Sequence, residues 1–188
     1  MISAFTTGFY NKLKLWPTTW ATGTAYAVGA IMKPTTYASH AYKCTTAGTS
    51  AAVTEPSWGT TNGGTTADGA GTLVWTCFDT LTYNTLAPQT AVLPYVTFGL
   101  LTDVPMGTFK YVAAIEDMTF YVNVFTITSV AHAMTLAGLV NTAMSDVTLS
   151  ITGYTAMKCL REYVGGVIYE PDTKTYQIPL RFRVQGSL

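Results

Sequence analysis

Residues 116–144 read EDMTFYVNVFTITSVAHAMTLAGLVNTAM, and this stretch changes from one periodicity to another. From Met118 to Thr128 apolar side chains occupy both sets of alternating positions, which predicts a strand with both faces covered. From Ser129, a residue type suited to an N-cap, apolar residues recur at spacings of three and four, which predicts an amphipathic helix ending near Asp146. The apolar stripe of that helix consists of Val130, Ala133, Met134, Ala137, Val140 and Met144.

Strand patterns surround this unit on both sides. The clearest lies near the C-terminal end, where Tyr176, Ile178, Leu180, Phe182 and Val184 alternate with Gln177, Arg181, Arg183 and Gln185. Further strands are predicted over 93–101, 147–154 and 156–169. The order of strands, helix and strands predicts an α+β fold, an antiparallel sheet with packed helices.

The composition divides the chain into a parent domain and an insertion. Residues 17–77 carry four charges, Lys33, Lys43, Glu55 and Asp68, and are rich in threonine and tryptophan, which favours short strands and turns. The string TTNGGTTADGAG at 60–71 predicts a turn-rich loop before an apolar strand over 73–78. We therefore expect a small all-β module at 17–77 inserted in a domain made of 1–16 and 78–188, with a short helix near the start.

Two domains in tandem with a separate N-terminal peptide are the competing arrangement. The first sixteen residues are too few for a domain, so the insertion requires them to pack on the second segment. Deleting 17–77 separates the two readings, because a true insertion leaves a folded parent.

Charge and motif content argue against several classes of protein. Ten basic and ten acidic residues give a net charge of zero, which disfavours sequence-specific binding of nucleic acid. No apolar run is long enough for a membrane helix. His40 and His132 lie in different predicted domains and no phosphate-binding loop occurs, so we expect no metal, no cofactor and no enzymatic activity. The three cysteines, Cys44, Cys77 and Cys159, are expected to be buried thiols, although pairing of Cys44 with Cys77 stays open.

The parent domain resembles a known family. The run APQTAVLPYVTFGLLTDVP at 87–105, with its Pro94–Tyr95 motif, the strand–helix run quoted above, and EPDTKTYQIPLRFRVQ at 170–185 are similar to the tail-completion or tail-terminator proteins of long-tailed bacteriophages. The resemblance implies a structural virion protein that assembles in the bacterial cytoplasm. It also implies a ring, usually a hexamer, that ends tail-tube polymerisation and joins the tail tube protein to the head–tail connector or stopper.

The insertion has a resemblance of its own. The spacing of Trp20, Tyr26, Gly29, Ile31 and Tyr42 is similar to carbohydrate-binding modules of the family 5/12 kind. Sugars stack on aromatic rings, and the best candidates for such a contact are Trp58, in a predicted loop, and Tyr37. Trp58 could equally belong to the core of so small a module, whereas Trp20 and Trp75 are expected in that core.

A ring would also give the apolar strand and the last strand a partner. We expect Arg181, Arg183 and Phe125 at a subunit interface, with the arginines facing acids such as Glu116, Asp117, Glu162 or Asp172. A merely exposed polar face is the alternative for the two arginines. Another neck component, such as a stopper or connector, and a glycan-binding accessory protein are the alternatives for the whole chain.

Overall fold

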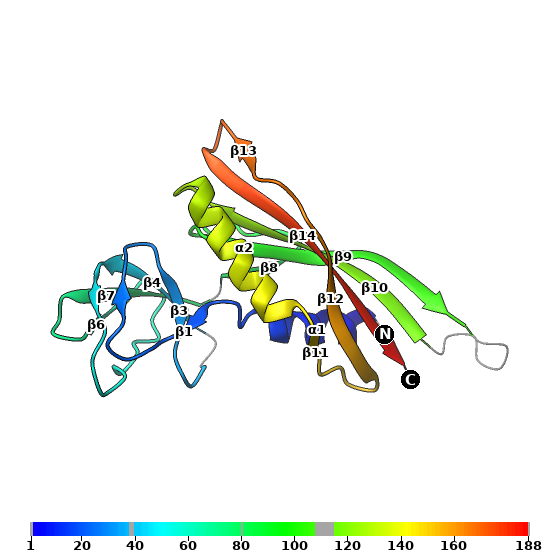
Figure 1. Ribbon diagram of the computed structural model, residues 1–188, viewed down its shortest axis with the longest axis horizontal. Coiled ribbons are helices and arrows are strands. Elements are labelled where there is room, and N and C mark those ends of the chain that lie inside the picture. Colours follow the sequence, from blue (N-terminus) through cyan, green and yellow to red (C-terminus); the bar gives the residue numbers. More distant parts are fainter. Residues whose placement is uncertain (1, 38–39, 80, 108–114, 188) are drawn as a thin grey trace. The chain divides into compact units, whose positions relative to one another are not determined.

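The computed structural model describes residues 2–37, 40–79, 81–107 and 115–187. The chain forms two compact units (Figure 1). One consists of Met1–Trp16 and Thr82–Leu188, and the other is Pro17–Leu81. Strands dominate both, and the described helices belong to the first unit. The fold is therefore mixed α+β, as predicted.

The first unit is built on a seven-stranded sheet in the order β11-β12-β14-β10-β9-β8, with β13 paired to β14. All neighbours are antiparallel except β8 and β9. The strands are β8 (Thr82–Asn84), β9 (Tyr95–Met106), β10 (Ile115–Thr126), β11 (Val147–Thr148), β12 (Thr155–Val164), β13 (Ile168–Glu170) and β14 (Thr175–Ser187).

Helix α2 (Val130–Met144) packs on β10, β12 and β14. It begins where predicted, because Oγ of Ser129 accepts a hydrogen bond from the backbone N–H of His132 at 3.1 Å. Much of its predicted apolar stripe is buried, but Val130 and Met134 are exposed. These two residues sit on a flank of the helix that the sheet does not reach.

Helix α1 (Ile2–Leu13) also belongs to the core of this unit, as expected for the N-terminal segment. Its Phe5, Phe9 and Leu13 are fully buried, and the ring of Phe9 stacks on Phe120 with centroids 4.2 Å apart. Gly8 allows the close approach, since a Cβ there would lie 2.8 Å from the carbonyl oxygen of Ser150.

The helices cover one face of the sheet. In the β10–β14 register, residues Phe120, Val122 and Val124 lie opposite Phe182, Leu180 and Ile178, and all six are buried. The alternate residues of β10 are less covered: Tyr121 and Phe125 are half-buried, and Ile127, just beyond the end of the strand, is exposed. A single chain thus covers one face of β10 with its helices, and cover on the other face is expected from a neighbouring subunit.

The second unit has a five-stranded sheet in the order β1-β3-β4-β7-β6 and a two-stranded sheet of β2 and β5. Its core holds Trp20, Met32, Tyr42, Cys44, Leu73, Trp75 and Cys77, so Trp20 and Trp75 are core residues as expected. The strands are β1 (Thr18–Thr19), β2 (Ala25–Tyr26), β3 (Ile31–Lys33), β4 (Ala41–Thr46), β5 (Gly48–Thr49), β6 (Thr65–Asp68) and β7 (Leu73–Phe78).

Several predicted boundaries are wrong. The segment 60–71 is not all loop, because β6 pairs with β7 across the Asp68–Leu73 turn. Of the strand predicted over 147–154, only Val147–Thr148 pairs, and the remainder lies outside regular strands. The strand predicted over 156–169 is two strands, β12 and β13. Gly165 and Gly166 separate them, since glycine disfavours a continuous strand.

The junction between the units falls slightly later than predicted. Phe78 ends β7 in the second unit, so the first unit resumes only at Thr82. There the Nε1–H of Trp16 donates a hydrogen bond to Oγ1 of Thr82 at 3.2 Å. The chain therefore leaves the first unit and re-enters it at adjacent points.

Candidate interaction surface

The uncovered face of the seven-stranded sheet, which we call the open face, carries the alternate residues of its long strands. Antiparallel sheets often expose one face, and that face is then normally polar. Here it includes large apolar and aromatic side chains: Leu160 and Tyr163 on β12 are 50% and 49% exposed. On β9, Leu101 and Val104 are exposed as well. An apolar face of this kind is typical of a surface that another protein covers.

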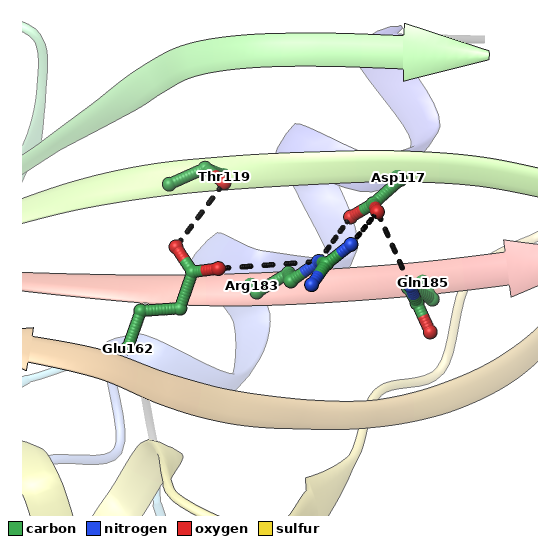
Figure 2. Close-up of polar contacts among 5 residues, drawn as sticks. All are labelled: Asp117, Thr119, Glu162, Arg183 and Gln185. Atoms are coloured by element: carbon green, nitrogen blue, oxygen red, sulfur yellow. Dashed lines mark hydrogen bonds and ion pairs between the residues drawn. The ribbon is translucent and has the colours of Figure 1, made fainter. Parts of the chain in front are cut away.

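A polar network crosses the open face near the ends of three strands (Figure 2). The Nε–H of Arg183 on β14 donates to Oδ1 of Asp117 on β10 at 2.7 Å, and its Nη2–H donates to Oδ2. Gln185 donates to the same carboxylate at 3.1 Å. Oε1 of Glu162 on β12 lies 3.9 Å from Nε of Arg183.

These contacts favour the ionised form of Asp117. The hydrogen bonds from Arg183 lower the pKa of Asp117, outweighing its burial, and Gln185 adds to the effect. Asp117 therefore stays ionised and holds the guanidinium in place. Of the four acids that the sequence offered to the two arginines, Asp117 and Glu162 contact Arg183 within the same chain.

The third acid, Glu116, lies elsewhere. It alternates with Asp117 along β10, points to the covered face and is 1% exposed. Burial, together with the neighbouring Asp103, raises the pKa of Glu116. Glu116 is thus closed off from any partner on the open face.

Arg181 has different surroundings from Arg183. Its guanidinium lies 5.6 Å from the centroid of the Tyr163 ring. It helps to line a hollow of about 470 Å³ on the open face. The hollow is bounded by Leu101, Tyr121, Asn123, Tyr163, Pro179, Leu180 and Arg181. Tyr121 can lie across this surface because its neighbour on β9 is Gly99, where a Cβ would be 2.5 Å from the tyrosine oxygen.

Phe125 lies on the same face, toward the other end of β10. Its ring is 5.3 Å from that of Tyr95, and Tyr95 lies 5.7 Å from Tyr83. The three residues predicted for an interface, Arg181, Arg183 and Phe125, therefore share one face of one sheet. Sequence reasoning missed Tyr121, Tyr163 and Leu101, which become neighbours of Arg181 only through strand pairing.

In the second unit, Glu55 contacts the candidate Trp58 and the segment that precedes the candidate Tyr37. Oε1 of Glu55 accepts hydrogen bonds from Nε1–H of Trp58 at 2.8 Å and from the backbone N–H of Thr35 at 3.0 Å. Burial raises the pKa of Glu55, but the bonds from Thr35 and Trp58 outweigh it and lower the pKa overall. Glu55 thus ties the Trp58 loop to the loop that carries Tyr37.

Trp58 is also part of the core margin. It is half-buried and packs on Tyr42 and Trp75, with ring centroids 4.6 and 6.3 Å away. Tyr37 is half-buried as well.

Sequence reasoning missed the structural role of Asp68 in this unit. The residue is 3% exposed, and its carboxylate accepts four hydrogen bonds. Its Oδ2 accepts from the indole N–H groups of Trp20 and Trp75 at 2.8 and 3.1 Å. Its Oδ1 accepts from the backbone N–H groups of Ala51 and Gly69 at 3.0 and 2.6 Å. The Asp–Gly pair indicated only a turn, and nothing local pointed to the two tryptophans.

The described residues offer few groups of side chains that are typical of a catalytic or metal-binding site. In the part of the chain that the structure describes, no three His, Cys, Asp or Glu side chains form a group that could hold a metal ion. His40 lies 3.6 Å from Asp79, while Nδ1 of His132 lies 2.9 Å from Oγ1 of Thr126 in the other unit. None of the described helices is long and apolar enough to cross a membrane.

The three cysteines are buried free thiols, as expected. Burial raises the pKa of Cys159 to about 12 and also raises those of Cys44 and Cys77. Although β4 and β7 are neighbours, Cys44 lies opposite Trp75, and Cys77 lies opposite Tyr42. These thiols are therefore poor nucleophiles.

An α+β unit with an uncovered, partly apolar sheet face is typical of a protein that binds other subunits. The family model described as "Tail completion protein gp17" matches residues 66–185, and the chain belongs to this family of structural phage tail proteins, which is not an enzyme family. The predicted resemblance of the parent domain to phage tail-completion proteins is thus confirmed. The match begins at β6 in the second unit and continues through the later segment of the first unit, from Thr82 to Gln185, without α1.

Among solved structures, the chain is similar to one from the "Virion of native gene transfer agent (GTA) particle". The two share 18% sequence identity with a TM-score of 0.48 over 58% of this chain and 81% of that chain. No curated protein matches the chain.

Proposed function

We propose that this tail completion protein forms a closed ring, a hexamer, at the head-proximal end of the phage tail tube. The observation that carries the proposal is the open face, where Leu101 and Tyr163 lie exposed beside Arg181 and Leu160 lies exposed opposite Arg183. A neighbouring copy that covers this face would bury apolar area, and that burial is the main force in most protein association. Closed rings use such heterologous contacts.

In this position the ring ends polymerisation of the tail tube protein on one side and binds the head–tail connector or stopper on the other. Family membership supports a place in the virion tail. The buried free thiols are compatible with assembly in the reducing cytoplasm of a bacterial host. Another neck component, such as a stopper or connector, is the alternative.

The first test concerns Arg181, which contacts Tyr163 and faces the hollow. We expect the wild-type protein to sediment as a closed oligomer and Arg181→Glu to sediment largely as monomers, because a charge reversal at a covered contact repels the partner. Sedimentation velocity and negative-stain images of rings provide the measurement. Arg183 is unsuitable for this test, since its replacement would leave Asp117 without its intramolecular partner.

Lys12→Glu on α1 is the matched control, because it makes the same charge change away from the open face and should leave the oligomer intact. Circular dichroism should report a folded protein for both variants. An Arg181→Glu protein that forms the same rings as wild type would contradict the use of the open face. A wild type that stays monomeric at all concentrations would contradict the ring.

A second candidate function belongs to the unit Pro17–Leu81, which we propose is an inserted module that binds a cell-surface glycan. The adjacency of Trp16 and Thr82 supports the insertion, since both ends of the module then join the first unit at one place. The contact of Glu55 with both Trp58 and Thr35 supports the glycan site, because it holds two aromatic-bearing loops together beside a carboxylate that could accept from sugar hydroxyls.

For this site we expect Tyr37→Ala to weaken binding on a glycan array by about tenfold while the melting temperature changes little, because a half-exposed ring contributes more contact to a ligand than to the core. Trp58→Ala should abolish binding but also lower the melting temperature, because Trp58 packs on Tyr42 and Trp75. Identical array profiles for wild type and Tyr37→Ala would exclude Tyr37 from the site. If wild type binds no glycan, the module is structural.

A further inference from the structure

The acidic side chains of the chain divide into those with a partner inside the chain and those without. All ten lie among the described residues, and eight have a hydrogen bond, an ion pair or a neighbouring carboxyl group: Glu55, Asp68, Asp79, Asp103, Glu116, Asp117, Asp146 and Glu162. Glu170 and Asp172 are the other two, and both are exposed. In the described parts of the chain, no side chain pairs with either.

Both acids lie where β13 turns into β14, in a hairpin that Figure 1 shows reaching past the end of α2. The hairpin is held by its own contacts: the rings of Tyr169 and Tyr176 lie 4.9 Å apart, and Oγ1 of Thr175 donates to the carbonyl of Thr173 at 3.3 Å. Beside the acids, Ile168 and Tyr169 are 51% and 49% exposed. The hairpin thus presents apolar and acidic groups together.

The hollow on the open face presents the complementary groups. It is lined mainly by apolar and aromatic residues, with Arg181 at one side. No carboxylate among the described residues lies within ion-pair distance of Arg181, whose guanidinium faces the ring of Tyr163. Arginine recognises carboxylates through a two-pronged hydrogen-bond geometry, so an acid beside an apolar group suits this hollow.

The hairpin and the hollow of one chain cannot meet. Arg181 is six residues along β14 from Thr175, which at about 3.3 Å per residue places it roughly 20 Å from the turn. Two complementary patches that are separated on one subunit give a head-to-tail contact between copies, and repetition of that contact closes a ring.

We infer that the β13–β14 hairpin of one copy docks in the Arg181 hollow of the next copy, with Glu170 and Asp172 against Arg181 and with Ile168 or Tyr169 on the apolar wall. This inference rests on the proposed ring and names the partner segment that covers its open face. Pairing of this kind favours one orientation of neighbours, because a reversed subunit would place like charges together.

A charge exchange tests the contact. The double variant Glu170→Lys/Asp172→Lys should weaken association at least about tenfold in sedimentation, as should Arg181→Glu. Combining all three changes should restore rings, because the charges are then reversed on both sides of the same contact. Lys12→Glu again serves as the control.

A cysteine pair provides a second measurement with the charges of the contact largely intact. Tyr169→Cys combined with Asn123→Cys, a residue of the hollow, should form disulfide-linked oligomers under mild oxidation, whereas each single variant should not. The natural cysteines are buried and should not contribute.

The outcomes separate the two proposals. A monomeric wild type removes the ring and the docking contact together. Wild-type rings that persist unchanged in Glu170→Lys/Asp172→Lys remove only the hairpin contact. Failure of the triple variant to recover, together with no cross-linking in the cysteine pair, also overturns the contact. Where the charge variants do weaken association, recovery in the triple variant or cross-linking of the cysteine pair supports it.

Discussion

Replacing Asp68 with asparagine is expected to lower the free energy of unfolding of the unit Pro17–Leu81 by about 3 kcal/mol or more. The carboxylate accepts four hydrogen bonds, two of them from the indoles of Trp20 and Trp75. Bonds to a charged acceptor are stronger than neutral ones, and an amide replaces one acceptor oxygen with a donor. The one remaining oxygen can accept either from the two indole N–H groups, which share Oδ2, or from the two backbone N–H groups, which share Oδ1, so one of these pairs loses its acceptor.

Urea denaturation followed by tryptophan fluorescence measures this effect, because Trp20, Trp58 and Trp75 all lie in this unit. Asp79→Asn is the control, since its side chain is exposed in the same unit. Its free energy of unfolding should stay within about 0.5 kcal/mol of wild type. Equal midpoints for Asp68→Asn and Asp79→Asn would mean that the carboxylate does not organise the core.

The pH dependence provides an independent check of the same contact. Burial raises the pKa of Asp68, but its four hydrogen bonds outweigh burial, and the folded pKa lies below the ordinary value. The stabilisation is therefore present above the unfolded pKa of about 4 and is lost as the pH falls through the folded pKa. Between neutral pH and pH of about 3, wild type should lose more stability than Asp68→Asn, and parallel curves would contradict the assignment.

Local periodicity accounts for the parts of the fold that were predicted correctly. The alternation in 176–185 and the cap at Ser129 depend on residues a few positions apart, and both give the expected elements, β14 and α2. Asp68 could not be found in this way, because its partner Trp20 lies 48 residues away. Likewise, the turn residues of 60–71 gave no indication of β6, because that strand is defined by its pairing with β7.

The open face illustrates the same limit at the candidate site. Alternation places Arg181 and Arg183 on one face, but it does not say which strands flank them. Pairing of β14 with β10 and β12 brings Asp117 and Glu162 to Arg183, and brings Tyr163 to Arg181. The two arginines therefore differ in a way that their identical sequence setting does not reveal: one is satisfied within the chain, and the other faces the hollow.

Truncation of Phe9 to alanine is expected to cost the first unit about 3–5 kcal/mol, the usual range for a buried phenylalanine. Phe9 is fully buried and its ring lies 4.2 Å from Phe120 and 5.7 Å from Phe98. Loss of the ring leaves a cavity between α1 and two central strands, β9 and β10, which cannot collapse without moving the sheet.

Two units can unfold separately, so the measurement must report on the first unit itself. Hydrogen exchange resolved to β9, β10 and β14 does this, and these strands should exchange faster in Phe9→Ala. Ile2→Ala, an exposed change on the same helix, should leave their protection nearly unchanged. Equal protection in the two variants would mean that α1 is not part of the core. Because the strands that Phe9 supports also carry Tyr121 and Leu101, loss of protection there should be accompanied by weaker ring assembly in Phe9→Ala, although Phe9 itself lies on the covered side of the sheet.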